Sequence, residues 1–201
     1  MFRRISPLIL FLVFLIVIGI VVSLGPKERT LGANVRLVYL HGAWVWTALI
    51  SFMAAALFGI AGLVASRPYL QRWSLAWGQV GTFFWITYLP ISLWTMQANW
   101  NGLYLDEPRW RIGIDLALIG LLLQAAIVLW RRTDWASALN GIYFVLLLTK
   151  LVGVEQVMHP PSPIFSSQSS VIPLFFSGLV IACLLTAWQL SRWLFARAAI
   201  R

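Results

Sequence analysis

Six long apolar runs, separated by short polar clusters, constrain this chain more than any other feature of its sequence. They lie at about residues 7–24, 38–65, 73–96, 112–130, 135–156 and 171–194. A helix needs about 20 apolar residues to cross the roughly 30 Å hydrocarbon core of a bilayer. Only 10% of the residues are charged, against about 25% in a soluble domain, so the chain cannot cover a water-facing surface. We therefore expect an all-α integral membrane protein in which residues 1–201 form a single domain of six transmembrane helices.

The basic residues predict the orientation of this bundle. Lys and Arg resist translocation, so the side of the membrane that holds more of them is cytoplasmic. Nine lie on one side, namely Arg3, Arg4, Arg67, Arg72, Arg131, Arg132, Arg192, Arg197 and Arg201, and five lie on the other, namely Lys27, Arg29, Arg36, Arg109 and Arg111. We expect both termini to be cytoplasmic and the connections near 25–37, 97–111 and 157–170 to face outward from a prokaryotic cytoplasmic (inner) membrane. Because the net charge of +9 is spread over helix ends, a nucleic-acid partner is not expected.

The remaining polar residues exclude most enzymatic chemistry. Cys183 is the single cysteine and lies inside an apolar run, and the chain contains no P-loop, no Gly-x-Ser-x-Gly motif and no His-Glu-x-x-His motif. Transporters carry discontinuous helices at mid-membrane, whereas Pro90 is the single proline in the middle of a run. We therefore expect neither catalytic residues nor a small-solute transporter.

His41 and His159 are the only two histidines, and the predicted topology places both on the outward side. Two neutral imidazoles that converge from different helices can occupy both axial positions of a haem iron. Zinc is a poorer match, since it normally takes three or four protein ligands. A histidine at a helix end is also often an interfacial polar residue, and that alternative stays open. The pair predicts haem b as the cofactor, with His41 and His159 as the metal ligands.

The outward segment from Trp94 to Trp110 is rich in large aromatic side chains. Such a segment should lie on the membrane surface and offer an apolar platform to a flat ligand or a partner, unless it is a simple interfacial belt. Arg109 lies in the same segment, and guanidinium groups pair well with carboxylates. Arg109 is therefore a candidate partner for a haem propionate, the alternative being a helix-end charge without a ligand.

Three charged residues lie at membrane depth: Asp115, Lys150 and Glu155. Charges at this depth are costly unless they are paired or face a cavity. Lys150 is near enough to the outward boundary for its long stem to reach the interface, and a pair between Lys150 and Asp115 is the alternative. The five-residue spacing of Lys150 and Glu155 argues against a tight pair on one helix face.

Taken together, these features resemble the haem-handling cytochrome c assembly family, and within it the haem exporter protein C (CcmC-like) branch. In that family the first histidine opens a helix in a His-Val-Pro-x-x-Trp-type motif, and the second stands in a Trp-Asn-Thr-Leu-His-Gln-type motif. His41 and Trp44 match the first, and His159 corresponds to the second in position. The chain departs from both motifs, because Gly42 follows His41 and two prolines follow His159.

The family also carries a tryptophan-rich outward segment that reads like Trp-Gly-x-Trp-Trp-x-Trp-Asp. Trp100, Gly102, Tyr104 and Asp106 form a shortened version of it, in which most of the tryptophans are missing. The resemblance implies that His41 and His159 ligate haem, and that Trp44, Trp100 and Asp106 belong to the haem-binding region with Arg109.

The same resemblance implies a function and a set of partners. The chain would present haem at the extracytoplasmic face for cytochrome c maturation, without independent catalysis. Its partners would be haem, the lipid bilayer, a haem chaperone and other membrane subunits. The alternative is a structural or assembly subunit of a larger bioenergetic membrane complex, derived from this family and lacking haem.

Overall fold

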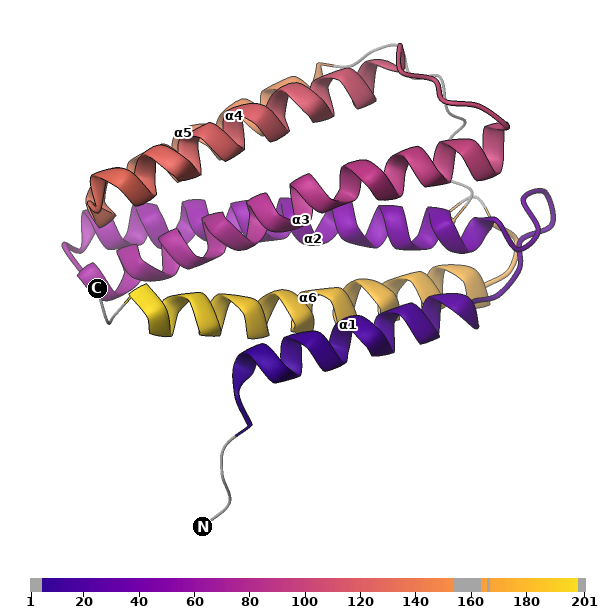
Figure 1. The fold of residues 1–201 in the computed structure, drawn as a ribbon, viewed down its shortest axis with the longest axis horizontal. Helices are drawn as coiled ribbons and strands as arrows, with labels where there is room; N and C mark the ends of the chain where they lie inside the picture. Colours follow the sequence, from indigo (N-terminus) through magenta and orange to yellow (C-terminus); the bar gives the residue numbers. More distant parts are fainter. Residues whose placement is uncertain (1–4, 154–163, 166, 199–201) are drawn as a thin grey trace.

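The structure is a computed structural model that describes residues 5–153, 164–165 and 167–198. Six helices occupy this part of the chain (Figure 1): α1 (Pro7–Ser23), α2 (Val35–Val64), α3 (Pro68–Trp100), α4 (Pro108–Trp130), α5 (Thr133–Val152) and α6 (Val171–Ala198). Each lies on one of the apolar runs, and the expected and observed ends agree within a few residues. The all-helical class is therefore confirmed, although the last residues of the expected fifth span, 154–156, lie outside the described residues.

The number of membrane spans is confirmed only in part. Among the described residues, four helices are long and apolar enough to cross a membrane, namely α2, α4, α5 and α6. The apolar helix α1 has only 17 residues. The 33-residue helix α3 contains five tryptophans, together with many hydroxyl and amide side chains, which lower its mean hydropathy.

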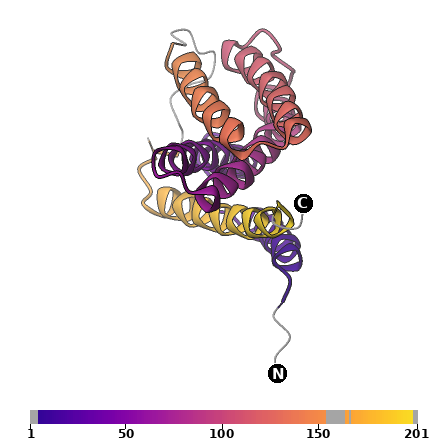
Figure 2. The same cartoon turned by 90° about the vertical axis from the view of Figure 1, so that its left-hand side faces the viewer.

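The helices form three layers (Figure 2). The pair α2 and α3 is the middle layer, and α4 and α5 lie on one face of it, while α1 and α6 lie on the other. The described residues of α4 make contacts with α3 and α5 but none with α6. Both α2 and α3 contact the two outer layers, and α3 also contacts α4.

Local sequence explains where the helices begin and end. Proline stands at the start of α1, α3 and α4, where its missing N–H costs no helical hydrogen bond. Asn101 and Arg131 adopt left-handed backbone conformations and end α3 and α4.

The connection between α3 and α4 is therefore shorter than the expected stretch of 97–111. It spans only residues 101–107, because α3 continues to Trp100 and α4 begins at Pro108. Glu107 caps α4, since its carboxylate accepts a hydrogen bond from the backbone N–H of Trp110 at 2.6 Å. Trp100 and Arg109 consequently lie on helical turns rather than in a loop.

Tryptophans near the ends of membrane helices are often interfacial anchors, and in this bundle some have that position and others do not. Trp94, Trp130 and Trp135 are exposed, as an anchor requires. Trp77 and Trp110 are instead buried inside the bundle. Their rings fill space between helices, which the linear sequence does not distinguish from an interfacial position.

A buried polar network joins the layer of α4 and α5 to the middle layer. Asn140 on α5 accepts a hydrogen bond from the Gln124 amide on α4 at 2.9 Å, and donates to the backbone oxygen of Ser74 on α3 at 3.0 Å. The hydroxyl of Ser74 donates in turn to the backbone oxygen of Ala55 on α2 at 2.7 Å. A Cβ added at Gly78 would lie 2.6 Å from Asn140 Oδ1, so glycine at this position makes room for the network.

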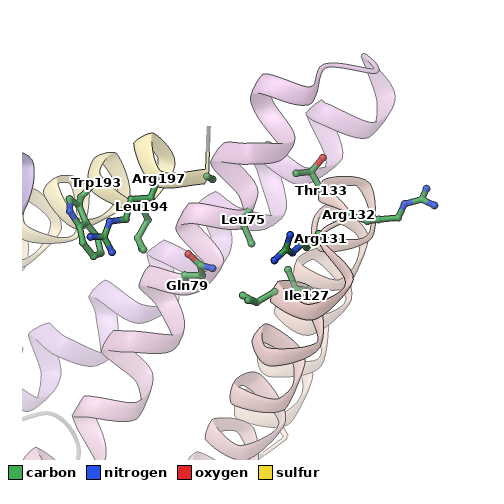
Figure 3. Close-up of a pocket in the computed structure, with 11 residues that line it drawn as sticks. Leu75, Gln79, Ile127, Arg131, Arg132, Thr133, Trp193, Leu194 and Arg197 are labelled. Atoms are coloured by element: carbon green, nitrogen blue, oxygen red, sulfur yellow. The ribbon is translucent and has the colours of Figure 1, made fainter. Parts of the chain in front are cut away.

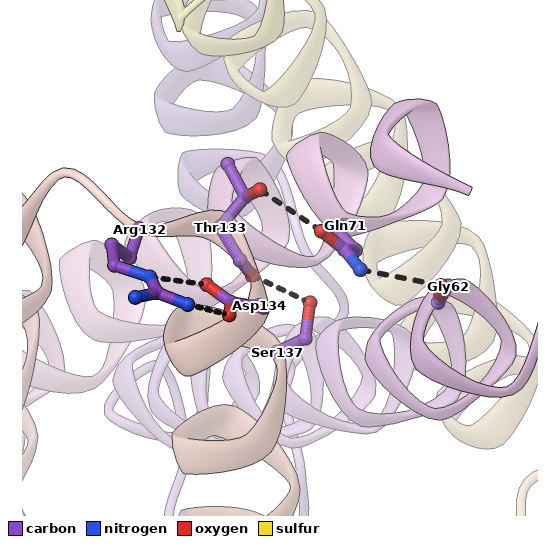
Figure 4. A network of polar contacts seen from close by, with 6 residues as sticks. All are labelled: Gly62, Gln71, Arg132, Thr133, Asp134 and Ser137. Atoms are coloured by element: carbon purple, nitrogen blue, oxygen red, sulfur yellow. Dashed lines mark hydrogen bonds and ion pairs between the residues drawn. The ribbon is translucent and has the colours of Figure 1, made fainter. Parts of the chain in front are cut away.

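A second network lies at the same end of the bundle, where α2 meets α3 and α4 meets α5 (Figure 4). The hydroxyl of Thr133 donates to Gln71 Oε1 at 2.9 Å, and Gln71 Nε2 donates to the backbone oxygen of Gly62 at 3.3 Å. Arg132 forms two hydrogen bonds to the carboxylate of Asp134, at 3.1 and 2.5 Å. The contacts of Gln71 with Thr133 and Gly62 hold the start of α5 against the neighbouring ends of α2 and α3. The pair of Arg132 and Asp134 is local to the start of α5.

Candidate functional site

His41 lies near the start of α2, on the face that packs against α3. Its imidazole is half-buried, and its Nδ1 atom is shielded from solvent. The ring centroids of His41 and Tyr88 lie 5.8 Å apart, with their planes tilted by 58°. A ring at this separation restricts the imidazole and forms an apolar wall beside it. His41 is therefore an ordered side chain at a helix junction, not a solvated helix-end residue.

Tyr88 connects the His41 position to α4. Its side chain is buried, and a Cβ added at Gly113 would lie 1.7 Å from its hydroxyl oxygen. The ring of Trp85 packs against Tyr88 at 5.0 Å, while its Nε1 donates to the backbone oxygen of Gly113 at 3.1 Å. Glycine at position 113 therefore lets α4 approach α3 at the level of His41.

Trp44 lies one turn after His41 and joins α2 to α3. It is buried, its Nε1 donates to the Thr87 hydroxyl at 2.8 Å, and its ring packs against Phe84 at 4.8 Å. Thr87 immediately precedes Tyr88, so this contact fixes the part of α3 that faces His41. The geometry gives Trp44 a packing and positioning role.

The connection of residues 101–107 exposes apolar side chains at the same end of the bundle. Leu103, Tyr104 and Leu105 are exposed to 53%, 43% and 52%. Trp100 is half-buried and packs edge-on against Tyr104, with ring centroids 5.5 Å apart. This connection therefore forms an apolar surface, as expected, over a shorter stretch than the sequence indicated.

The charged residues around this connection have different surroundings. Asp106 forms an exposed ion pair with Arg111, so its carboxylate already has a cationic partner. Glu107 is buried, and among the described residues no hydrogen-bond partner reaches its Oε1 atom. Arg109 is exposed on the first turn of α4, one turn before Gly113.

The connection between α1 and α2 folds onto the same end. Arg36 Nε donates to the backbone oxygen of Gly25 at 2.9 Å, and the carboxylate of Glu28 accepts the backbone N–H groups of Thr30 and Leu31 at 2.7 and 2.8 Å. The hydrogen bond from Leu31 is the main reason that the pKa of the half-buried Glu28 side chain lies below its ordinary value. This connection is thus a defined turn beside the start of α2.

The predicted site residues therefore fall into three groups. His41 and Trp44 lie on α2 within the α2–α3 junction, and Arg109 lies one turn from the glycine that accommodates Tyr88. Trp100 and Asp106 lie on or beside the neighbouring connection. His159 and Glu155 lie outside the described residues, so the predicted pairing of His41 with His159 on one iron stays a prediction.

The alternative of a Lys150–Asp115 ion pair does not hold in the structure. Both side chains are exposed, and the ion pairs formed within the described part of the chain are Arg111–Asp106 and Arg132–Asp134. The contact between α4 and α5 runs instead through Tyr143, whose hydroxyl donates to the backbone oxygen of Leu116 at 2.8 Å. Asp115 and Lys150 are therefore on faces that point away from this contact.

Sequence reasoning missed three residues that organise the bundle: Tyr88, Glu107 and Asn140. Glu107 carried a usable signal, because an acidic residue directly before a proline is a common helix start. Tyr88 and Asn140 carried only the general signal of a polar group inside an apolar run. Their partners are on other helices, so the linear sequence does not identify them.

Comparison with known proteins gives one distant relative. Over 183 residues the chain is 25% identical to a cytochrome c biosynthesis ccmC-like mitochondrial protein of the liverwort Marchantia polymorpha, and the match covers 87% of this chain and 79% of that protein. No family model matches the chain, and no solved structure matches it. The match extends over most of the chain and gives weak support to the resemblance to CcmC-like proteins.

Proposed function

We propose that this multi-pass membrane protein handles haem in cytochrome c biogenesis, and that it binds haem where the outward ends of α2, α3 and α4 meet. The observation that carries the proposal is the ordered, half-buried His41 imidazole beside Tyr88. The distant similarity to a protein named for cytochrome c biosynthesis supports it along most of the chain. Haem would be the cargo of this site, presented to a haem chaperone and other membrane subunits.

The chemistry of the side chains at this end fits a haem. A neutral imidazole supplies an axial nitrogen to iron, and aromatic rings provide apolar walls for a porphyrin. The exposed guanidinium of Arg109 offers a partner for a propionate carboxylate. In this proposal His41 and His159 would ligate the iron of haem b, and Arg109 would contact a propionate.

The proposal includes a topology in which all six helices cross the membrane and both termini are cytoplasmic. The helix α3 lies against α2 and also contacts α4, α5 and α6, so it must cross with these apolar helices. The helix α1 packs along α6, and its 17 residues give a length of about 26 Å. The excess of arginines at the opposite end supports an extracytoplasmic position for His41, and the proposal assigns the protein to a prokaryotic cytoplasmic (inner) membrane.

The test is the haem content of the purified protein. We expect a reduced-minus-oxidised haem spectrum and a pyridine haemochrome of type b for the wild type, and a sharp loss of both in His41→Gly and His159→Gly. Added imidazole should restore the spectrum of each glycine variant, because it replaces the missing ligand without refolding the helix. Trp46→Ala is the control, since Trp46 is exposed on α2 and lies away from the His41 contact. Wild-type haem content in both histidine variants would disprove ligation by these residues.

A haem-free role as an assembly subunit is the second candidate. The exposed side chains of Leu103, Tyr104 and Leu105 favour it, because an apolar surface next to the membrane can dock a partner protein. A photocrosslinker placed at Tyr104 should then capture a membrane partner equally well in wild type and in His41→Gly. Crosslinking that depends on haem would instead favour the first candidate.

A further inference from the structure

A cavity of about 290 Å³ lies at the end of the bundle opposite His41, where α3 runs between α4 and α6. Leu75 and Gln79 of α3 form its floor, and Ile127 of α4 and Leu194 of α6 form parts of its sides. Figure 3 shows these residues around an open space between the helices. Gln79 and Tyr88 are nine residues apart on α3, so their backbones lie roughly 14 Å apart along the axis. The cavity is therefore separate from the proposed haem site.

The cavity exists because α4 and α6 do not meet. Within the described residues these two helices make no contact, and α3 separates them. An apolar groove that opens toward a bilayer cannot remain empty, since its walls would lose all contacts on one side. Water is a poor occupant beside the apolar part of the walls, which is formed by Leu75, Ile127, Val128 and Leu194. An acyl chain both fills the groove and needs no hydrogen-bond partners from its walls.

The mouth of the cavity is cationic. Arg131 and Arg197 line it, and none of the lining residues is acidic. Arg197 lies with its guanidinium carbon 4.0 Å from the centre of the Trp193 ring, which keeps the charge at the rim. Arg132 also belongs to the lining, but its guanidinium is engaged by Asp134 and extends away from the cavity (Figure 3). Arg131 and Arg197 are thus two lining cations without an acidic residue in the lining to neutralise them, and the Arg197 guanidinium lies over the Trp193 ring (Figure 3).

We propose that this cavity binds one acidic phospholipid, with an acyl chain on the floor formed by Leu75 and Gln79 and its phosphate between Arg131 and Arg197. Guanidinium groups bind phosphate oxygens in pairs of hydrogen bonds, and basic pockets between helices at the membrane surface bind anionic headgroups. The position at the last turns of α4 and α6 suits a headgroup at the membrane interface. The proposal is independent of haem binding.

The test is lipid retention by the full-length protein, measured by native mass spectrometry after release from nanodiscs. Nanodiscs of phosphatidylcholine with phosphatidylglycerol are compared with nanodiscs of phosphatidylcholine alone. We expect the wild type to retain phosphatidylglycerol, and the double variant Arg131→Gln, Arg197→Gln to bind it roughly thirtyfold more weakly, since each arginine contributes about fivefold at a membrane surface. The matched control is Arg67→Gln, Arg192→Gln, which removes the same charge at the same end outside the cavity.

A second pair of variants tests the cavity without changing charge. Ala198→Trp places a large ring among the lining residues, whereas Ala196→Trp adds the same ring at an exposed position nearby. Only the first should lower retention of phosphatidylglycerol, and thermal melting in phosphatidylcholine nanodiscs checks that both fold. Equal losses in the two arginine double variants would overturn the proposal, as would equal retention of both lipids by the wild type. Binding of inorganic phosphate alone, with no lipid preference, would also overturn it.

Discussion

The two ends of this bundle differ in how the layer of α4 and α5 is attached to the middle layer. At the arginine-rich end, directional hydrogen bonds between side chains cross from helix to helix, through Asn140, Gln71 and Thr133. At the other end, α4 meets α3 through the rings of Trp85 and Tyr88 beside Gly113. The ring stack of Trp73, Trp188 and Phe195 at the arginine-rich end joins α3 to α6 instead. A buried hydrogen bond fixes distance and angle, whereas packed rings fix shape and offer apolar faces to a flat ligand. The comparison indicates that one end fixes the helix layers and the other is suited to binding.

Asn140→Leu should have the largest effect on stability. The side chain is buried at 2% exposure, and its loss leaves the Gln124 amide and the Ser74 carbonyl without that partner. We expect the free energy of unfolding to fall by about 2–4 kcal/mol, measured by thermal or denaturant unfolding in detergent. Haem content per folded molecule should not change, and a selective loss of haem would show that the two ends are coupled.

Gly113→Ala should disturb the opposite end. The new Cβ would lie 1.7 Å from the Tyr88 hydroxyl oxygen, so the tyrosine must move or α4 must separate from α3. We expect a loss of about 1–3 kcal/mol in stability and a reduced haem content in the same preparation. Gly178→Ala is the matched control, because nothing lies within 4 Å of a Cβ there. That variant should be neutral or slightly more stable.

Trp44→Phe separates packing from haem contact. The variant keeps a ring but removes the Nε1 donor to Thr87, and the expected cost is about 1 kcal/mol of folding stability. Haem retention should follow the folded fraction if Trp44 only positions α3. A haem loss that exceeds the unfolding would instead assign Trp44 a direct contact, and titration of apoprotein with haem measures the difference.

Arg109→Gln should weaken haem binding only slightly. Because Arg109 is exposed, a propionate contact there is worth about 0.2–1 kcal/mol, or a few-fold in the dissociation constant. The difference between wild type and variant should shrink as salt concentration rises. A loss as large as that of His41→Gly would place Arg109 in a desolvated part of the site.

Lys150→Met should be nearly silent. Lys150 is exposed near the end of α5 and has no ion-pair partner within the described residues, so its removal leaves no buried carboxylate behind. The expected change in unfolding free energy is within about 0.5 kcal/mol. A larger destabilisation would reveal a partner for this charge in the assembled membrane protein.

Much of the secondary structure could be predicted from the sequence, and little of the tertiary contact pattern. The six apolar runs coincide with α1 to α6, and Pro7, Pro68 and Pro108 mark three helix starts. The connection of 101–107 was overestimated because the aromatic and amide residues before it look like a surface segment, although they continue α3. The role of His41 as a haem ligand stays a prediction, and its contact with Tyr88 was not foreseen.

The sequence by itself determined that the chain is helical and membrane-embedded, because a backbone within lipid must satisfy its hydrogen bonds inside each segment. It also determined which end is rich in arginine. Only the tertiary structure decided which helix faces meet, and hence that His41 lies beside Tyr88, that Asn140 joins Gln124 to Ser74, and that α4 and α6 leave a cavity between them. The physical reason is that lipid is as apolar as the side chains themselves. A helix in a membrane therefore carries little periodic contrast between its buried and lipid-facing sides, and small residues and isolated polar groups decide the packing.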